Sequence, residues 1–517
     1  MVNTILARRV NHIVAKGDNP AWPKGSKSRG FSRDSRMNNS YFTYNPDFLK
    51  EGVEIAPLTA SVKGVKGRFP VYGESDRKYQ KLPPFLADSL PDDWGNQLFE
   101  RWRIDNKLSN ADITPLEKLS FIGKRGMGAL EFVPDVSRTF MKERIDIPSL
   151  VELARRIFTE RENARILPEE SLTMQSLIAV GTSAGGRQPK AILAVNRENG
   201  EIRSGQIAGL KGYDYCILKF GDPQRCSAEL EMAYYEMCRH AGIDMMESRL
   251  LEVDGEKHFL TKRFDREGEE KLHTQTLAAL CPGTDSYEKL LGVCRKMRLP
   301  EKDAEEVFRR MVFNILANNT DDHDKNFSFV MDKQGRWRLS PAYDMTFIFN
   351  TGGYQPQEER CFMVRGKLVG ITRQDALDFA KDNGIRRAES IMNDVVEAIK
   401  SFKDIAAGYG VKEEWIGRID SCLSQHLAGW GCLPDKENVG GDFSLVVDNH
   451  TVHVRIEQAY KGNYHLLASV DGRELKYIFR TGMETHGQIE RKGIAGLSSE
   501  DILQMVRTYI MPKLEKM

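Results

Sequence analysis

Residues 319–328 gather many chemically active side chains in one short stretch, which reads Asn-Thr-Asp-Asp-His-Asp-Lys-Asn-Phe-Ser. Three acids and two amides stand beside one histidine and one lysine. The segment before it has apolar residues at helical spacing, at positions 307, 308, 311, 312, 315 and 316. A polar cluster at the end of a buried helix is a common way to hold a functional site on a rigid support. This stretch is therefore the first candidate site.

The residue types in this stretch fit phosphoryl transfer. That reaction needs a carboxylate near the attacking hydroxyl and oxygen ligands for Mg²⁺, which protein kinases supply as Asp-x-x-x-x-Asn followed by a later Asp. Asp321 and Asn326 have this spacing, and Asp344 is a later aspartate. Their oxygens suit a hard cation that keeps some of its water. A polar loop whose Asp and Asn only cap turns would look the same, so upstream residues must decide.

Two short strands are expected between this cluster and Asp344, at residues 327–331 and 337–339. The turn at 332–335 ends in a glycine and would join them as a hairpin. The hairpin would bring Asp344 back toward Asp321 and Asn326.

The upstream elements follow the order of a kinase small lobe. A glycine-rich stretch at 181–190 leads into a predicted strand, and Lys219 lies near the end of a later strand. Glycines let backbone N–H groups approach phosphates, and a lysine adds a positive charge. A predicted helix at 228–241 carries Glu229 and Glu231 in its first turn. Either could pair with Lys219, although acids there also complement the helix dipole.

The composition of the 517-residue chain is that of a globular protein, with 40% apolar and 29% charged residues, and the length allows two to four domains. A net charge of +1 argues against wholesale nucleic-acid binding. No apolar run reaches the length of a membrane span, and the N-terminus does not resemble a signal peptide. The eight cysteines form no Cys-x-x-Cys pair, so we expect reduced core thiols, such as Cys216 and Cys238, in a cytoplasmic protein.

Taken in order, the motifs resemble the HipA-type serine/threonine kinases of bacterial toxin–antitoxin systems over roughly residues 41–430. The motifs that carry the resemblance are Leu90-Pro91-Asp92, residues 183–190, Ile217-Leu218-Lys219, Arg263-Phe264-Asp265-Arg266, residues 320–328 and Tyr343-Asp344-Met345. Their number and order make the match more specific than any one motif.

The resemblance implies an ATP- and Mg²⁺-dependent serine/threonine protein kinase. It implies that Asp321 and Lys219 are catalytic, with Asp321 as the base, and that Asn326 and Asp344 hold Mg²⁺. The nucleotide-binding residues implied are Ser183, Gly185, Gly186, Gln188, Lys190, Lys219, Glu231, Lys262, Phe264, His323 and Lys325, with Lys262 and Phe264 at the adenine. Ser183 also matches the family's autophosphorylation site.

The fold class expected is α+β, with a two-lobed, protein-kinase-like fold. The expected segments are a basic flexible arm at 1–40, an N-terminal HipA-like subdomain at 41–135, a kinase N-lobe at 136–264, a mostly helical C-lobe at 265–435 and an additional small α+β domain at 442–517. The arm replaces the strand with which the family begins, and Asn318 stands where the family often has a glycine.

The partners implied are a protein substrate with a Ser or Thr acceptor and a separate helix-turn-helix antitoxin, since this chain shows no such module. Contact with DNA would then be indirect, through the antitoxin, and no membrane is involved. Two other functions remain open from the residues alone. One is a catalytically silent HipA-like binding or repressor subunit, and the other is a small-molecule phosphotransferase. The intact Lys219, Asp321, Asn326 and Asp344 argue against the silent form.

Overall fold

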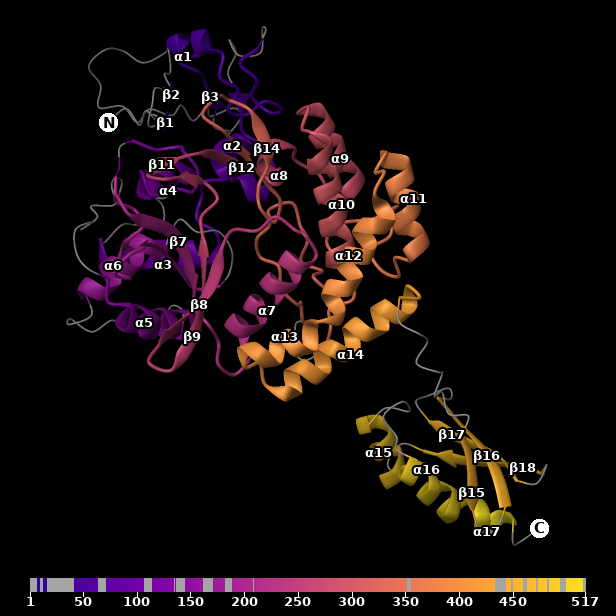
Figure 1. Ribbon diagram of the computed structural model, residues 1–517. Helices are drawn as coiled ribbons and strands as arrows, with labels where there is room; N and C mark the ends of the chain where they lie inside the picture. Colours follow the sequence, from indigo (N-terminus) through magenta and orange to yellow (C-terminus); the bar gives the residue numbers. More distant parts are fainter. Residues whose placement is uncertain are drawn as a thin grey trace. The chain divides into compact units, whose positions relative to one another are not determined.

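The computed structural model describes residues 7–9, 13–15, 41–63, 71–106, 114–133, 135, 145–160, 171–181, 188–207, 209–350, 355–432, 443–447, 450–458, 463–470, 473–480, 483–492 and 499–514. The chain divides into two compact units, Met1–His426 and Leu427–Met517. Helices and antiparallel sheets are mixed in both units (Figure 1), as an α+β fold requires.

The first unit contains a five-stranded antiparallel sheet of order β6-β5-β7-β9-β8. Its strands are β5 (Lys190–Asn196), β6 (Ile202–Ser204), β7 (Tyr213–Lys219), β8 (Ser248–Val253) and β9 (Glu256–Lys262). Strands β8 and β9 are joined by Asp254 and Gly255, both at positive φ, 51° and 79°. This two-residue Asp-Gly turn matches the twist of the strands, which is why the sequence makes a hairpin here.

The two faces of this sheet have different neighbours. Ala191 and Leu218 lie on one face, in a core shared with α5 (Ile147–Glu160) and α6 (Ser171–Gly181). Phe259 lies on the other face and packs against α7 (Ser227–His240). Because side chains alternate along a strand, Lys219 is on the same face as its β9 partner Phe259 and points toward α7.

A second sheet carries the expected hairpin. Strands β13 (Ser328–Met331) and β14 (Trp337–Leu339) pair antiparallel, and β12 (His273–Thr276) pairs with β13. The helices of this part are α8 (Leu277–Leu280), α9 (Tyr287–Lys296), α10 (Glu301–Leu316), α11 (Arg373–Asn383), α12 (Ala388–Lys400), α13 (Phe402–Tyr409) and α14 (Glu413–Gly429). The apolar residues predicted for the segment before the cluster are buried in α10, and the cluster follows its end.

The N-terminal part of this unit packs against both sheets. Its elements are β3 (Tyr41–Phe42), α1 (Pro46–Glu51), β4 (Val71–Tyr72), the 3₁₀ helix η2 (Arg77–Tyr79), α2 (Pro84–Ala87), α3 (Asp93–Asp105) and α4 (Pro115–Ile122). A separate short antiparallel pair, β10 (Arg266–Glu267) and β11 (Glu270–Lys271), comes after β9 in the chain. Thr114 and Glu117 form a capping box at α4, as the Thr-Pro-Leu-Glu pattern predicts.

The prediction of a flexible arm at 1–40 missed one feature. Strands β1 (Ala7–Arg9) and β2 (Ile13–Ala15) pair antiparallel, although no leading strand is evident from the sequence. The rest of that arm lies outside the described residues. Three-residue strands are too short for an alternation pattern to reveal them.

The second unit is an antiparallel meander with helices. Its elements are β15 (Phe443–Val447), β16 (His450–Gln458), β17 (Tyr464–Val470), β18 (Arg473–Phe479), α15 (Glu484–Lys492), α16 (Ser499–Met505), the π-helix η8 (Val506–Ile510) and α17 (Met511–Leu514). Val454, Leu466 and Phe479 from three strands and Ile502 from α16 share its core. Buried and partly exposed residues alternate along β17, which is the pattern of a half-buried sheet.

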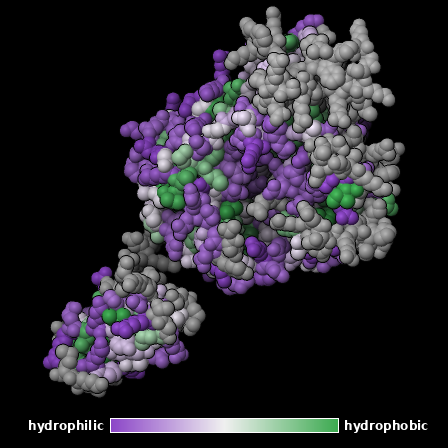
Figure 2. All heavy atoms as spheres, turned by 180° about the vertical axis from the view of Figure 1, so that it is seen from behind, coloured by the Kyte–Doolittle hydropathy of each residue, from purple (hydrophilic) through white to green (hydrophobic). Residues whose placement is uncertain are grey.

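Few large apolar side chains are exposed among the residues that the structure describes. Figure 2 shows a mostly hydrophilic face, and the large apolar side chains exposed among the described residues are the scattered Tyr72, Ile104, Phe158, Leu172, Val369 and Ile478. Scattered exposed apolar residues are ordinary for globular proteins. Over the described ranges, no helix is both long and apolar enough to cross a membrane. Cys216 and Cys238 are buried as predicted, but Cys361 is exposed, so core burial was wrong for that residue.

Candidate functional site

Lys219 is the last residue of β7 and is buried between two carboxylates. Its ammonium binds the carboxylates of Glu231, from α7, and Asp344, from the segment after β14. Burial alone would lower the pKa of Lys219, but the charges of Asp344 and Glu231 more than offset it, so the pKa is raised. Lys219 is therefore a permanent cation that joins β7 and the next helix, α7, to the segment after β14, which lies 125 residues further along the chain.

Glu231 is the acid of α7 that reaches the site. It is buried, whereas Glu229 is half-exposed, so the pairing left open between them goes to Glu231. Burial raises the pKa of Glu231, and the charge of Lys219 opposes that rise. Because the acid in the first turn of α7 is Glu229, the helix dipole does not account for the burial of Glu231 against Lys219.

Asp344 adopts a left-handed backbone conformation, with φ 54°. Non-glycine residues seldom occupy this region, and such strain often accompanies functional sites. The preceding Tyr343 fixes the segment, since its hydroxyl donates to the carbonyl of Lys325 (2.7 Å) and contacts the Ser328 hydroxyl (2.6 Å). Burial would raise the pKa of Asp344, but the charges of Lys219 and Lys190 hold it well below its usual range. The side chain is an anion.

Asp321 and Asp322 are adjacent but have opposite environments. The Asp321 side chain is 53% exposed, whereas that of Asp322 is 0% exposed. Asp322 accepts hydrogen bonds from four donors: the Tyr287 hydroxyl (2.7 Å), the Arg360 guanidinium (2.8 Å) and the backbone N–H groups of Cys361 (3.0 Å) and Phe362 (3.1 Å). Asp322 therefore anchors the loop, and Asp321 faces outward.

Three groups surround the outward carboxylate. His323 Nε2 lies 3.7 Å from Asp321 Oδ1, and the Cys361 thiol lies 3.8 Å from the same oxygen. The side-chain amide of Asn326 donates to the Asp321 carbonyl (2.6 Å). Burial raises the pKa of Asp321, and the charge of His323 opposes this. A raised pKa makes the ionised carboxylate a stronger base.

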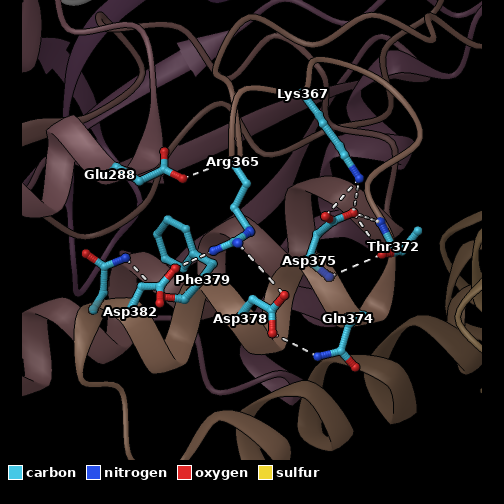
Figure 3. A network of polar contacts seen from close by, with 10 residues as sticks. Glu288, Arg365, Lys367, Thr372, Gln374, Asp375, Asp378, Phe379 and Asp382 are labelled. Atoms are coloured by element: carbon cyan, nitrogen blue, oxygen red, sulfur yellow. Dashed lines mark hydrogen bonds and ion pairs between the residues drawn. The ribbon is translucent and has the colours of Figure 1, made fainter.

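The segment that follows Cys361 is held in place by polar contacts with the helices α9 and α11 (Figure 3). The Arg365 N–H donates to Glu288 of α9 (2.7 Å), and its guanidinium pairs with Asp382 of α11. Lys367 pairs with Asp375 (2.7 Å), which also closes the capping box of α11. These contacts hold residues 361–372 against two helices beside the loop that follows α10.

Asn326 and Asp344 suit a divalent cation by their chemistry. Because the Asn326 nitrogen is engaged with Asp321, its amide oxygen is the atom left to act as a ligand. Asp344 is held ionised, and its side chain is 36% exposed. In the part of the chain that the structure describes, no group of three or more His, Cys, Asp or Glu side chains could form an all-protein metal site. Two protein oxygens, completed by water and phosphate, fit Mg²⁺.

The structure places the other predicted nucleotide-binding residues in different surroundings. Lys190 is buried and lies opposite Lys219 in the sheet register, on the same face. Gln188 is exposed just before it. Ser183, Gly185 and Gly186 lie outside the described residues. Lys325 points away from the loop and binds the carboxylate of Asp92 instead.

The structure does not bring the side chain of Lys262 together with Lys219, whereas it places Phe264 near the loop. Lys262 pairs in register with Cys216, three residues before Lys219, so it points to the opposite face. There it pairs with Glu247 (2.6 Å) and Asp214 (3.0 Å), beside a cavity of about 360 Å³. Its side chain is therefore not with Lys219. Phe264 is half-buried, and its ring stacks on Tyr343 at 5.7 Å between centroids.

Two family domains match this chain: the HipA N-terminal domain over residues 24–133 and the HipA-like C-terminal domain over residues 182–402. Together they cover more than half of the sequence and include every site residue described above. The protein belongs to the HipA family, as the resemblance of its motifs implied.

Among its relatives, the chain is 26% identical over 213 residues to the "Putative kinase" of Haemophilus influenzae, matching 36% of this chain and 60% of that protein. It is 31% identical over 135 residues to "Putative kinase Y4dM" of Sinorhizobium fredii, matching 23% of this chain and 33% of that protein. The chain thus spans less than two thirds of the length of these relatives.

The fold has a solved counterpart in the HipA–HipB–operator DNA complex of Shewanella oneidensis MR-1. The TM-score is 0.55 at 17% identity, covering 82% of this chain and 96% of that chain. At this identity the likeness concerns the fold alone.

Proposed function

We propose that this protein is an ATP- and Mg²⁺-dependent serine/threonine protein kinase of the HipA type. The observation that carries the proposal is the meeting of Lys219, Glu231 and Asp344 from three separate elements. Beside them stands an exposed aspartate, Asp321, braced by Asn326. These are the charges that phosphoryl transfer uses to hold phosphates, hold a metal and receive a proton.

In the proposed reaction, the oxygen of an acceptor hydroxyl attacks the γ-phosphorus of ATP. A new O–P bond forms, the bond to the β–γ bridging oxygen breaks, and ADP leaves. Asp321 takes the proton of the hydroxyl, and Lys219 places its charge on the phosphates. Asn326 and Asp344 would hold Mg²⁺, which supplies neutralisation of the phosphate charge. Asp322 keeps the loop in place through its four hydrogen bonds.

The nucleotide would lie between the face of the five-stranded sheet that carries Lys219 and the loop after α10, as in a two-lobed kinase. Phe264 supports a position for the adenine, because it is half-buried and stacks on Tyr343 beside the catalytic loop. Lys262 would contribute only its backbone, since its side chain is paired on the other face.

A separate helix-turn-helix antitoxin is the proposed partner, with DNA contacted only through it. The support is the solved HipA of Shewanella oneidensis, which is described in complex with HipB and operator DNA. The likeness in fold is compatible with a similar assembly.

Incubation with γ-labelled ATP, alone and with cell lysate, tests the proposed function. Label on serine or threonine of a protein, located by mass spectrometry, is the expected result. If label appears only on a small molecule, the function is that of a small-molecule phosphotransferase and not of a protein kinase. No transfer beyond that of an Asp321→Asn control would favour a silent repressor subunit.

We expect autophosphorylation at Ser183, in the glycine-rich stretch before β5. The phosphate would add close to two negative charges next to the ATP phosphates, so nucleotide affinity should fall by tenfold or more, about 1.4 kcal/mol. Phosphosite mapping after incubation with ATP, followed by calorimetry with nucleotide, measures both. A Ser183→Ala variant serves as the control that should keep full affinity. An unmodified Ser183 would contradict the expectation.

The rate should depend on pH through Asp321, which acts only when ionised. Since burial raises its pKa, kcat/KM should fall on acidification at a higher pH than for an ordinary aspartate. The charge of His323 opposes that rise, so His323→Gln should move the acidic limb further upward. Rate profiles between about pH 4 and pH 8, around the ordinary aspartate value, measure this. If the acidic side of the kcat/KM profile is the same in His323→Gln as in the wild type, the charge of His323 does not affect the pKa of Asp321.

A further inference from the structure

The N-terminal part of the first unit is joined to the catalytic loop by two ion pairs of opposite polarity. Asp92 binds the ammonium of Lys325, and Lys78 binds the carboxylate of Asp324 at 2.8 Å. The two loop residues are neighbours, and both directly precede Asn326. Each side therefore supplies one acid and one base to the same short stretch.

The side chain of Asp92 binds Lys325 and does not cap its own helix, α3. It occupies the N-cap position of α3 with extended backbone angles, where an aspartate normally accepts a hydrogen bond from its own helix. Its side chain makes no such cap bond. It reaches instead a residue 233 positions further along the chain. A side chain that leaves its own helix uncapped points to a role outside that helix.

Hydrogen bonds outside these two ion pairs reinforce the same junction. Asp88 accepts hydrogen bonds from Thr276 N–H (2.8 Å) and its hydroxyl (2.6 Å), and the Tyr79 hydroxyl donates to the carbonyl of Ala278 (2.8 Å). Thr276 is the N-cap of α8, and the Ala278 N–H donates to the carbonyl of Asp324 (3.1 Å). The N-terminal part thus holds the loop directly and through α8.

We propose that Asp92 and Lys78 are positioning residues that fix the catalytic loop through Lys325 and Asp324. The inference rests on the proposed kinase function and extends it to the N-terminal domain. Displacement of Lys325 would reach Asn326, whose amide holds the Asp321 carbonyl. It would also reach Tyr343, whose hydroxyl donates to the Lys325 carbonyl and which precedes Asp344. The base and both proposed metal ligands thus depend on this junction.

Asp92→Ser separates positioning from folding. Serine is as good an N-cap as aspartate, so the thermal midpoint should not fall, while the pair with Lys325 is lost. We expect kcat to drop roughly tenfold to hundredfold, as small misplacements in an active site do, with the KM for ATP little changed. Amide hydrogen exchange of residues 321–327 should become faster.

The charge-reversed double variant Asp92→Lys with Lys325→Asp should recover much of the lost rate and protection, because the pair is restored with opposite polarity. Asp394→Ser is the matched control, since Asp394 pairs with Arg309 at 3.0 Å between α12 and α10, away from the loop. It should leave kcat and the exchange of the loop unchanged.

Two results would overturn the inference. Asp92→Ser could keep the wild-type kcat and the wild-type exchange in an enzyme that transfers phosphate. Alternatively, it could raise the KM for ATP alone, which would make Lys325 a nucleotide ligand. An inactive wild-type protein would instead reject the proposed function, and hydrogen exchange would still decide whether Asp92 holds the loop.

Discussion

Replacing Asp321 by asparagine is expected to lower phosphoryl transfer by a factor on the order of 10² to 10⁴, the usual contribution of a general base. The substitution keeps the shape of the side chain but removes the negative charge that receives the proton. Because this side chain is 53% exposed, the fold does not depend on it. Transfer of label from ATP, measured beside thermal unfolding of the same preparation, separates the two quantities.

The neighbouring residue provides the matched comparison. Asp322→Asn should lower the free energy of unfolding by about 1–3 kcal/mol, since one oxygen that accepts two hydrogen bonds becomes an NH₂ group facing donors. Of the two adjacent aspartates, Asp321 would thus serve the reaction and Asp322 the stability of the fold. If Asp321→Asn retains the wild-type rate while folded, Asp321 is not the base and the kinase proposal is wrong.

The order of elements made much of the site predictable from the sequence. A glycine-rich stretch, a strand ending in Lys219, a helix starting near Glu231 and a hairpin leading to Asp344 are all local patterns. Each pattern fixes an element, and the family's connectivity then brings Lys219, Glu231 and Asp344 together. The residue within α7 that pairs with Lys219 stayed open, because helix-dipole arguments favour Glu229 and Glu231 equally.

What the sequence could not supply depends on register and on long-range contacts. Lys262 faces away from Lys219 because the pairing of β7 with β9 places it opposite Cys216, and a shift of one residue would reverse that face. The anchoring of Asp322 by Arg360 and the pair of Asp92 with Lys325 join segments with no shared local pattern. In the sequence, the only hint of the Asp322 contact with Arg360 was a second acid directly after Asp321. The only hint of the Asp92 pair with Lys325 was the Leu90-Pro91-Asp92 motif, whose role is not evident from the sequence.

Lys219→Met is expected to affect stability and nucleotide binding together. The substitution leaves the buried Glu231 and the anionic Asp344 without their shared cation. Breaking a buried ion pair from one side costs about 3–5 kcal/mol, and losing a charged contact to phosphate costs about 1.5–3 kcal/mol of binding. Denaturant unfolding and calorimetry with Mg²⁺-ATP measure these two losses separately.

The pH dependence of the Lys219→Met variant identifies the cause of its instability. Burial raises the pKa of Glu231 and Lys219 opposes that rise, so removing the lysine raises the pKa further. A carboxyl whose pKa is higher in the folded than in the unfolded protein binds its proton more tightly when folded, so stability increases as the pH falls through that pKa. The loss in free energy of unfolding relative to wild type should therefore become smaller on acidification.

A second substitution, Glu231→Gln, should restore part of the stability at neutral pH but none of the transfer activity. A deficit independent of pH, or nucleotide affinity equal to that of the wild type, would mean that Lys219 neither supports the buried acids nor binds the phosphates.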